Sequence, residues 1–394
     1  MPKKADPIPG HFLQLDGLRA FAAISVIVQH FTDLESFTRV PVGLAGVWLF
    51  FVLSGFLITG ILLKAKSTSG GDRGALGFAW RSFYLRRIVR IFPLYYGTLF
   101  LGAALALPGI RESFAWYCLN LANFLAAFPG KAAPPLFHFW SLSVEEQFYV
   151  VWPTVVLLAP RRAIAAASIG MIAVAPVSRF LMLRATGDWN LAQSIPPSCL
   201  DGLGAGALLA LLCEARWRPE ATKARWCRLA LAAGVALFLA DLASKVFNRG
   251  YSLPFAFRYT SFSLISLWLV NAARDGFRGV VGRVLEFGPL TYLGKISYGI
   301  YVFHFFIPSL VEWFRAKTGI SLGYPPEPGL AQFAFITVAS IAMASLSWYL
   351  MERPINDLKR FFPYARRRPE PEPAPPGDAV PVGGPGAAVN AGTP

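Results

Sequence analysis

The residues best placed to do chemistry lie in one short apolar stretch, residues 12–31. In an α-helix, the spacing of Arg19 and His30 is three turns plus about 20°, so both side chains would project from one face, ~16 Å apart along the axis. An ionisable side chain in hydrocarbon normally faces the protein interior or a wet cavity, because exposure to lipid costs several kcal/mol. If this stretch crosses a membrane, the pair predicts a functional site. The alternative is that Arg19 extends to the lipid headgroups and His30 lies at the interface.

Two further groups could serve a charged ligand. Ser54 and Gly55 form a small pair in the middle of the apolar run 43–63, where either close helix packing or an open cavity becomes possible. Arg86, Arg87 and Arg90 follow at the start of another apolar run. Because Arg87 and Arg90 are three residues apart, they share a helix face and could hold phosphates with forked hydrogen bonds. The alternative is a plain cationic anchor at the membrane surface.

The segment 138–149 has the densest polar content of any expected helix end. Its candidates for a catalytic or acceptor site are His138, Trp140, Ser141, Ser143, Glu145 and Glu146. Ser143 and Glu146 have capping-box spacing, so Glu146 could serve the helix N-terminus. Glu145 is then the less explained carboxylate, and it could orient a histidine that acts as a general base.

The apolar run 296–315 contains another histidine. Tyr298 and His304 are candidates for a substrate cavity here, and His304 lies nearly on the helix face of Ser297. A core histidine bonded to a neighbour is the alternative. At the end of the last apolar run, the residues Glu352-Arg353-Pro354 read as a helix stop with anchoring charges.

The composition indicates the elements that must position these groups. Hydrophobic residues make up 55% of the 394-residue chain and charged residues 15%, against about 25% charged in soluble domains. The chain is therefore expected to be an integral membrane protein. The net charge of +15 comes from basic residues in short segments between apolar runs, which argues against nucleic-acid binding. The four cysteines show no metal-ligand or disulfide spacing, so no metal is expected.

Ten runs are long enough to be helices that span a membrane. They lie near 12–31, 43–63, 91–108, 141–160, 163–183, 199–213, 229–247, 254–272, 296–315 and 329–351. Most Lys and Arg residues fall in alternate connections, which predicts that both termini are cytoplasmic. The expectation is an all-α, polytopic helix bundle of about ten transmembrane helices. It comprises a cytoplasmic segment 1–11, a transmembrane domain 12–360 and a disordered, Pro/Gly/Ala-rich cytoplasmic tail 361–394. Arg19 interrupts the first run, so an uncleaved span is expected rather than a signal peptide.

Taken together, the motifs resemble acyltransferase family 3 of membrane O-acyltransferases. The motifs are Leu15-Asp16-Gly17-Leu18-Arg19 with His30, the Phe-Val-Leu-Ser-Gly-Phe-Leu-Ile run at 51–58, Arg87-x-x-Arg90, Trp140 to Tyr149, Ser297 to His304, and Glu352-Arg353-Pro354. The resemblance implies a ten-helix domain that moves an acyl group, usually acetyl, from cytoplasmic acyl-CoA to a hydroxyl of a sugar-containing acceptor. By the same resemblance, His30 is the essential histidine, Arg19 is its partner, and Arg87 and Arg90 form the Arg-x-x-Arg site.

One departure from the family pattern is visible. Members often carry Arg-x-Asp before a later helix, whereas this chain has Cys199-Leu200-Asp201. The role of the absent arginine, in acceptor binding or in helix packing, is therefore open. Many relatives carry an extra esterase-like domain after the membrane part. This chain has a short tail there, so direct transfer to the acceptor is expected.

These features predict an enzyme of the bacterial inner membrane. Acetyl-CoA or another acyl-CoA is the expected co-substrate, bound by Arg19, Ser54, Arg87 and Arg90. His30 is expected to act as the base or to carry the acyl group, with Arg19 and Glu145 assisting. The expected partners are a glycan or glycosylated small molecule and membrane lipid, and a homo-oligomer is left open. The alternative is a polysaccharide or lipid-linked sugar transporter, because intramembrane Arg and His also mark substrate pathways.

Overall fold

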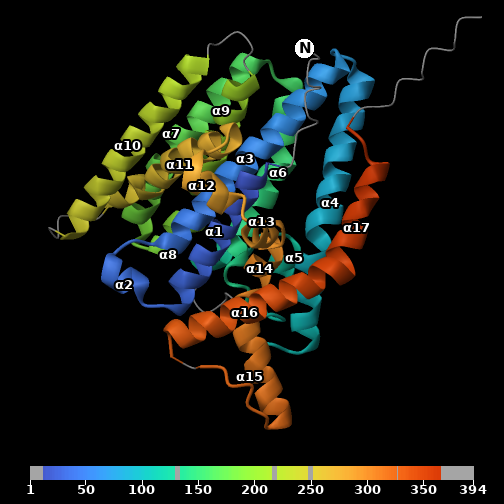
Figure 1. Ribbon diagram of the computed structural model, residues 1–394, viewed down its shortest axis with the longest axis vertical. Coiled ribbons are helices and arrows are strands. Elements are labelled where there is room, and N and C mark those ends of the chain that lie inside the picture. The colour runs from blue at the N-terminus through green and yellow to red at the C-terminus, as the bar shows by residue number, and fades with distance from the viewer. Residues whose placement is uncertain (1–11, 129–133, 215–219, 247–251, 326, 365–394) are drawn as a thin grey trace, which may run out of the picture.

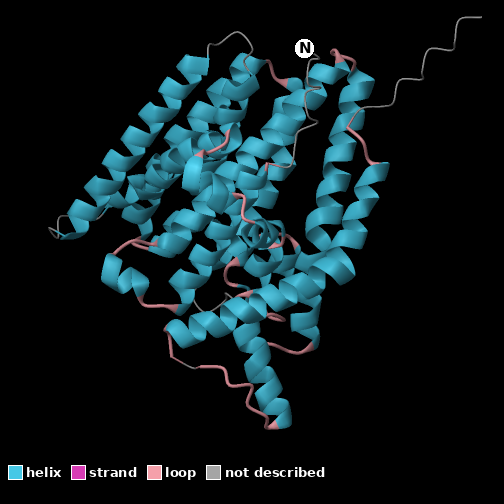
Figure 2. Cartoon of the chain, viewed as in Figure 1, coloured by secondary structure: helices cyan, strands magenta, loops and turns pink. Residues whose placement is uncertain are grey.

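All regular elements in the described part of the chain are helices. The computed structural model describes residues 12–128, 134–214, 220–246, 252–325 and 327–364. Within these ranges there is no strand, and loops join the helices (Figure 2). The all-α prediction is therefore confirmed. The expected N-terminal segment 1–11 and the expected tail from residue 365 lie outside the described residues.

The helices follow the predicted apolar runs closely. The first half of the chain forms α1 (Leu13–Phe31), α2 (Leu34–Thr38), α3 (Val42–Ser69), α4 (Arg73–Ala104), α5 (Phe114–Cys118), α6 (Phe139–Leu158), α7 (Arg161–Thr186), α8 (Trp189–Ser194) and α9 (Pro196–Glu214). The second half forms α10 (Glu220–Val246), α11 (Ser252–Asp275), α12 (Gly279–Leu285), α13 (Gly288–Lys295), α14 (Ser297–Phe303), α15 (Phe306–Thr318), α16 (Leu330–Ser347) and α17 (Arg353–Asp357). Short turns of other helix types are η1 (Ala122–Ala127), η2 (Pro134–Leu136), η3 (Trp348–Glu352) and η4 (Leu358–Phe361).

One predicted run is not a single helix. The run 296–315 divides into α14 and α15, with a turn at His304 and Phe305 between them. The prediction of one continuous span here is wrong, because periodicity cannot show where the chain changes direction. Figure 1 shows α15 projecting at the lower end of the molecule, beyond α14 and α16.

Six of the described stretches are long and apolar enough to cross a membrane, which indicates a multi-pass membrane protein. They are Val42–Ser69, Arg161–Thr186, Trp189–Glu214, Glu220–Val246, Leu253–Asp275 and Leu330–Phe361. The four other predicted runs correspond to α1, α4, α6 and the broken pair α14 and α15. These four carry nearly all the polar residues that the sequence singled out.

Helix α3 is the central element of the bundle. It is apolar on every side, and it contacts α1, α4, α6, α9 and α11. Glycines permit its closest approach: a Cβ on Gly55 would lie 2.1 Å from the Leu203 carbonyl oxygen of α9, and one on Gly206 of α9 would lie 2.0 Å from the Val52 oxygen. Backbone therefore packs against backbone, as small residues permit in membrane bundles. Close packing is thus the observed role of Gly55.

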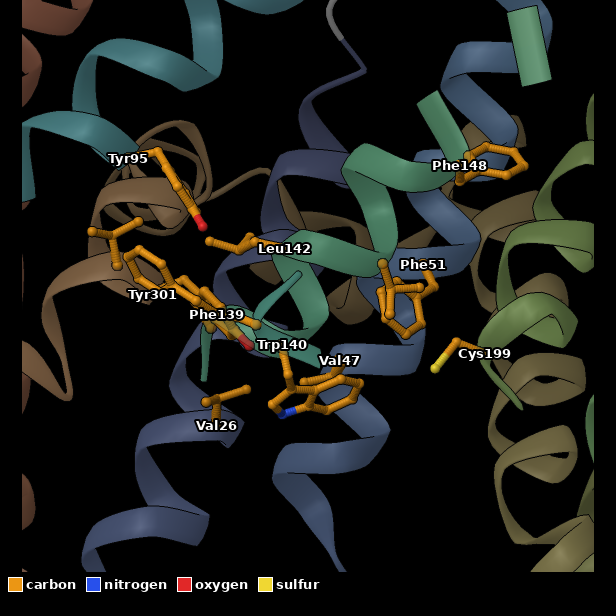
Figure 3. Close-up of a cluster of buried hydrophobic side chains, with 14 of the residues drawn as sticks. Val26, Val47, Phe51, Tyr95, Phe139, Trp140, Leu142, Phe148, Cys199 and Tyr301 are labelled. Atoms are coloured by element: carbon orange, nitrogen blue, oxygen red, sulfur yellow. The ribbon is translucent and has the colours of Figure 1, made fainter. Parts of the chain in front are cut away.

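The aromatic core lies beside this contact. Side chains from α1, α3, α4, α6 and α14 meet in one buried cluster, part of which is drawn in Figure 3. Trp140 of α6 belongs to this cluster, with its ring 6.4 Å from those of Trp48 and Phe51. The core holds α1, α6 and α14 against α3, and these helices carry the candidate site.

A buried ion pair joins α7 to α9. Arg179 Nη2 donates to Asp201 Oδ2 at 2.7 Å, and neither side chain is exposed. Thr260 of α11 and Trp48 of α3 also donate to the Asp201 carboxylate, at 2.8 and 2.9 Å. Asp201 therefore has an arginine partner from another helix, although the sequence has Cys199 where the family pattern often has an arginine. Four helices share one saturated polar centre, which meets the requirement that buried charges be paired and hydrogen-bonded.

Candidate active site

A pocket of about 510 Å³ lies between α1, α3, α4, α6 and α14. Its lining includes most of the polar residues that the sequence singled out: Arg19, Ser54, Arg86, Arg87, Arg90, Ser141, Glu145, Glu146 and Tyr298. The remaining wall is largely apolar, with Val47, Phe50 and Leu53 from α3. A few convergent charges in an otherwise apolar cavity are typical of a small-molecule site.

The guanidinium of Arg19 enters the pocket from α1 and is held in place there. Its Nη1 donates to Asp16 Oδ1 at 2.7 Å, one turn earlier on the same helix. Asp16 is buried, whereas the Arg19 side chain is 20% exposed. The ion pair orients the guanidinium and leaves its other nitrogens available to the pocket.

Arg86, Arg87 and Arg90 of α4 differ in their partners. Arg86 donates to the backbone oxygens of Lys359 and Phe362 at 2.8 and 3.1 Å, so it fastens the end of the chain's last helices to α4. Arg87 lies over the rings of Phe83 and Tyr149, 5.5 and 5.4 Å from their centroids.

Neither Arg87 nor Arg90 forms a hydrogen bond or ion pair with another residue in the described part of the chain. A guanidinium has five donors, so two such groups in one pocket offer a docking point for an anion.

A carboxylate of α6 faces the same pocket. Glu145 lies beside the hydroxyls of Ser54 and Tyr149, which hydrogen-bond to each other, and near the charge of Arg87. The helix begins at Phe139, so Ser143 is not an N-cap and the predicted capping box with Glu146 is wrong. Instead, the Ser143 hydroxyl accepts the backbone N–H of Ala122 at 3.2 Å. Neither Ser143 nor Trp140 is among the residues that line this pocket.

Tyr301 closes one end of the pocket. Its hydroxyl lies 2.5 Å from Ser141 Oγ, and it donates to the backbone oxygen of His138 at 3.1 Å. Its ring centroid is 5.2 Å from that of His138 and 5.4 Å from that of His304. Tyr298, on the same helix, donates to the Ile91 oxygen of α4 at 3.1 Å. Tyr301 thus separates the charged pocket from a group of histidines.

The histidine cluster consists of His30, His138 and His304. His30 Nδ1 lies 3.3 Å from His304 Nε2, and the two rings are stacked at 5.4 Å. The rings of His138 and His304 are 4.5 Å apart. His30 is partly exposed, whereas the other two are buried. The predicted orientation of His30 by Glu145 is not observed, because the neighbour of the imidazole is His304.

The structure therefore divides the predicted site into two parts, an arginine-rich pocket and a histidine cluster. Asp16, Tyr149 and Tyr301 complete these parts and were not singled out from the sequence. Asp16 could have been identified from the sequence, because it lies three residues before Arg19 and residues at this spacing are neighbours on a helix. In the described ranges, no three His, Cys, Asp or Glu side chains are grouped to hold a metal ion.

Comparison with known proteins gives a consistent picture. A family model described as an acyltransferase domain matches residues 12–351. The chain is 28% identical over 386 residues to a Bacillus subtilis protein named "Putative peptidoglycan O-acetyltransferase", covering 91% of this chain and 56% of that one. It is 26% identical over 365 residues to the peptidoglycan O-acetyltransferase of Listeria monocytogenes, covering 87% and 55%. The chain thus spans about half the length of these relatives. No solved structure is significantly similar to it.

Proposed function

Because the chain belongs to acyltransferase family 3, whose model covers residues 12–351, we propose that it is a membrane O-acetyltransferase acting on a glycan hydroxyl. Two of its relatives are named for peptidoglycan O-acetylation. A peptidoglycan-type sugar is therefore the acceptor class to test first. Neither relative is named as a transporter, and the transporter alternative gains no support.

The donor is acyl-CoA, most simply acetyl-CoA. The observation that carries this proposal is the pair of guanidiniums, Arg87 and Arg90, that line the pocket and form no hydrogen bond or close ion pair in the described part of the chain. CoA carries several phosphate charges, which such a pair binds with charge-assisted hydrogen bonds. Arg19, already oriented by Asp16, adds a third positive group to the wall. Ser54 and Glu145 line the same pocket and are the residues expected beside the thioester arm.

His30, in the histidine cluster on the other side of Tyr301 from the pocket, performs the transfer. As a general base, its free imidazole nitrogen takes the proton of the acceptor hydroxyl, and the oxygen attacks the thioester carbonyl. The carbon–sulfur bond then breaks, and the CoA sulfur leaves with the proton that the imidazolium returns. A transient acyl-histidine is the second route, in which the same nitrogen attacks the thioester and the carbon–sulfur bond breaks to release CoA thiolate. The acceptor hydroxyl then attacks the acyl-imidazole, its proton passes to the thiolate, and the free imidazole is restored. Both routes need an unprotonated nitrogen on His30.

The proposed arrangement in the membrane places the arginine-rich pocket and the histidine cluster at different depths. We propose ten spans, counting the broken pair α14 and α15 as one, with both termini in the cytoplasm of a bacterial inner membrane, so that the arginine end of the pocket opens toward cytoplasmic CoA. His30 is eleven residues beyond Arg19, which is ~16 Å along the helix axis. The histidine cluster therefore lies nearer the outer face, where an envelope glycan arrives.

The test uses the full chain in lipid vesicles, with acetyl-CoA carrying a radioactive acetyl group and soluble peptidoglycan fragments as acceptor. Ester-linked label on the fragments, dependent on both substrates, supports the proposal. His30→Ala is expected to lower kcat by ~10²- to 10⁴-fold while acetyl-CoA still binds, because the lost base acts mainly in the transition state. A folded His30→Ala protein with near-normal turnover, or label transfer without acetyl-CoA, would overturn it.

A further inference from the structure

The contacts of the two ring nitrogens of His304 bear on which nitrogen of His30 carries a proton. The turn between α14 and α15 provides the starting point. α14 ends at Phe303, and the carbonyls of a last helical turn lack their usual N–H partners. Two of these carbonyls face histidines: His304 Nδ1 lies 2.5 Å from the Tyr301 oxygen, and His138 Nε2 lies 3.1 Å from the Val302 oxygen.

A carbonyl oxygen only accepts hydrogen bonds, so the Nδ1 of His304 must carry a proton and donate it to Tyr301. His304 is fully buried, and its ring neighbours are His30, Phe31, His138, Tyr301 and Phe305. An aromatic and imidazole surrounding does not compensate a buried positive charge. The ring is therefore neutral, and its Nε2 has a lone pair and no proton.

The same reasoning extends to the next ring. His304 Nε2 can only accept, and the atom 3.3 Å away is His30 Nδ1. His30 must therefore carry its proton on Nδ1 in order to donate it. In a neutral imidazole, the other nitrogen, Nε2, is then unprotonated.

From this chain of contacts we propose that His304 is a positioning residue that fixes His30 in the tautomer with a free Nε2. The order of donation is His30 Nδ1 to His304 Nε2, and His304 Nδ1 to the Tyr301 carbonyl. This inference rests on the proposed function for its catalytic meaning, because it supplies the unprotonated nitrogen that both transfer routes require. The tautomer itself is a property of the protein without substrates.

This arrangement shares one general property with other catalytic histidines. A base is oriented by whatever holds its second nitrogen, and loss of the correct tautomer lowers kcat strongly while substrate binding persists. Here a second histidine replaces the carboxylate that usually takes this place. Glu145, which the sequence suggested for this task, is in the arginine-rich pocket instead.

The test compares two variants of nearly equal shape, His304→Gln and His304→Met. The carboxamide oxygen of Gln can accept the Nδ1 proton of His30, whereas Met offers no comparable acceptor. In the Met variant, kcat is expected to fall by ~10²-fold or more with the KM for acetyl-CoA little changed, while the Gln variant stays within ~10-fold of the parent. A kcat retained in the Gln variant but lost in the Met variant would show that His304 orients His30 and does not merely fill space.

A direct measurement accompanies the kinetics. Nitrogen-15 NMR of histidine-labelled full chain in lipid, assigned with a His30→Gln variant, reports which His30 nitrogen is protonated. We expect Nδ1–H in the parent and in His304→Gln, and a loss of that preference in His304→Met. A parent protein with the proton on Nε2 would overturn the proposal, as would a Met variant with unaltered kcat. Because the spectrum is recorded without acetyl-CoA or a glycan, it distinguishes failure of the tautomer assignment from failure of the proposed enzyme activity.

Discussion

At the residue scale, the charges of the pocket separate into neutralised and available groups. Arg19 is paired with Asp16, and Arg86 is used by two backbone carbonyls. Arg87 and Arg90 remain without a hydrogen-bonding or ionic partner in the part of the chain that the structure describes. Unpaired donors in a pocket favour the binding of an anion, because charge-assisted hydrogen bonds contribute more than neutral ones. The spacing in the sequence predicts such a pair, and its role in binding an anion rather than in anchoring the helix stays a prediction.

This difference leads to a prediction for donor binding. Changing Arg87 and Arg90 together to Gln is expected to raise the KM for acetyl-CoA by ~10-fold or more, since hydrogen bonds to charged groups contribute roughly 1.5–3 kcal/mol. The loss should shrink as salt rises, because added ions already screen the attraction in the parent. Steady-state kinetics at several salt concentrations measures both effects.

The matched control for this pair is Arg81→Gln. Arg81 is an exposed arginine of the same helix, and it does not line the pocket. Its loss should leave the KM unchanged. If the double variant folds and binds acetyl-CoA as tightly as the parent, the pair acts only as a membrane anchor.

At the scale of elements, the site depends on how closely α3 and α9 approach. The contact is reciprocal: Gly55 faces a backbone oxygen of α9, and Gly206 faces one of α3. Neither obstacle is a flexible side chain, so an added methyl group cannot be accommodated by a rotamer change. The position of α3 in turn sets the place of Ser54, directly before Gly55, in the pocket wall.

Gly55→Ala is therefore expected to destabilise the protein by roughly 1–3 kcal/mol, the usual cost of overpacking. Gly206→Ala should act in the same direction. The natural control is Gly60→Ala on the same helix, where a Cβ would meet no atom within 4 Å. Thermal unfolding of the purified proteins in detergent compares the three variants, with a lowered midpoint expected for the first two alone. Equal midpoints for Gly55→Ala and Gly60→Ala would contradict the close approach.

On the scale of the whole molecule, the most apolar helices and the helices that carry the pocket charges are largely different. The six stretches apolar enough to span a membrane include the central α3 and the outer helices α7, α10 and α16. Apart from α3, the pocket is lined by α1, α4, α6 and α14, which carry the charges. Figure 1 shows the connection from α3 to α4 at the upper end and α15 at the lower end. The charged side chains of these helices thus face an internal pocket, which is the arrangement that the cost of intramembrane charge favours.

The proposed orientation can be tested with single cysteines. Ser67→Cys in the exposed end of α3 and Asp357→Cys near the end of α17 should both face the cytoplasm, as the distribution of basic residues indicates. Ser321→Cys, after α15, should face outward. In intact cells, a membrane-impermeant maleimide should label only the third above the background of the four native cysteines. Labelling of only one of the first two would require an odd number of spans between them and contradict the layout.

The sequence by itself determined the helical class, the position of most helices and the chemical types at the site. These are local properties: an apolar run long enough to be a helix is recognisable wherever it later packs. The shared face of Arg19 and His30 is also local, because helix periodicity fixes it. For the same reason the motif residues of α4, α6 and α14 could be named in advance.

Only the tertiary structure decided which of these residues meet. Arg179 and Asp201 come from different helices, and nothing in their spacing predicts a pair. His30, His138 and His304 are distant in the chain and converge because α14 ends at Phe303 and the chain turns. The sequence suggested that Glu145 orients a histidine, yet Glu145 lies beside Arg87 and Tyr149. The physical reason is that periodicity orients a side chain around its own helix axis, whereas contacts between helices depend on the glycine-permitted approach of one backbone to another.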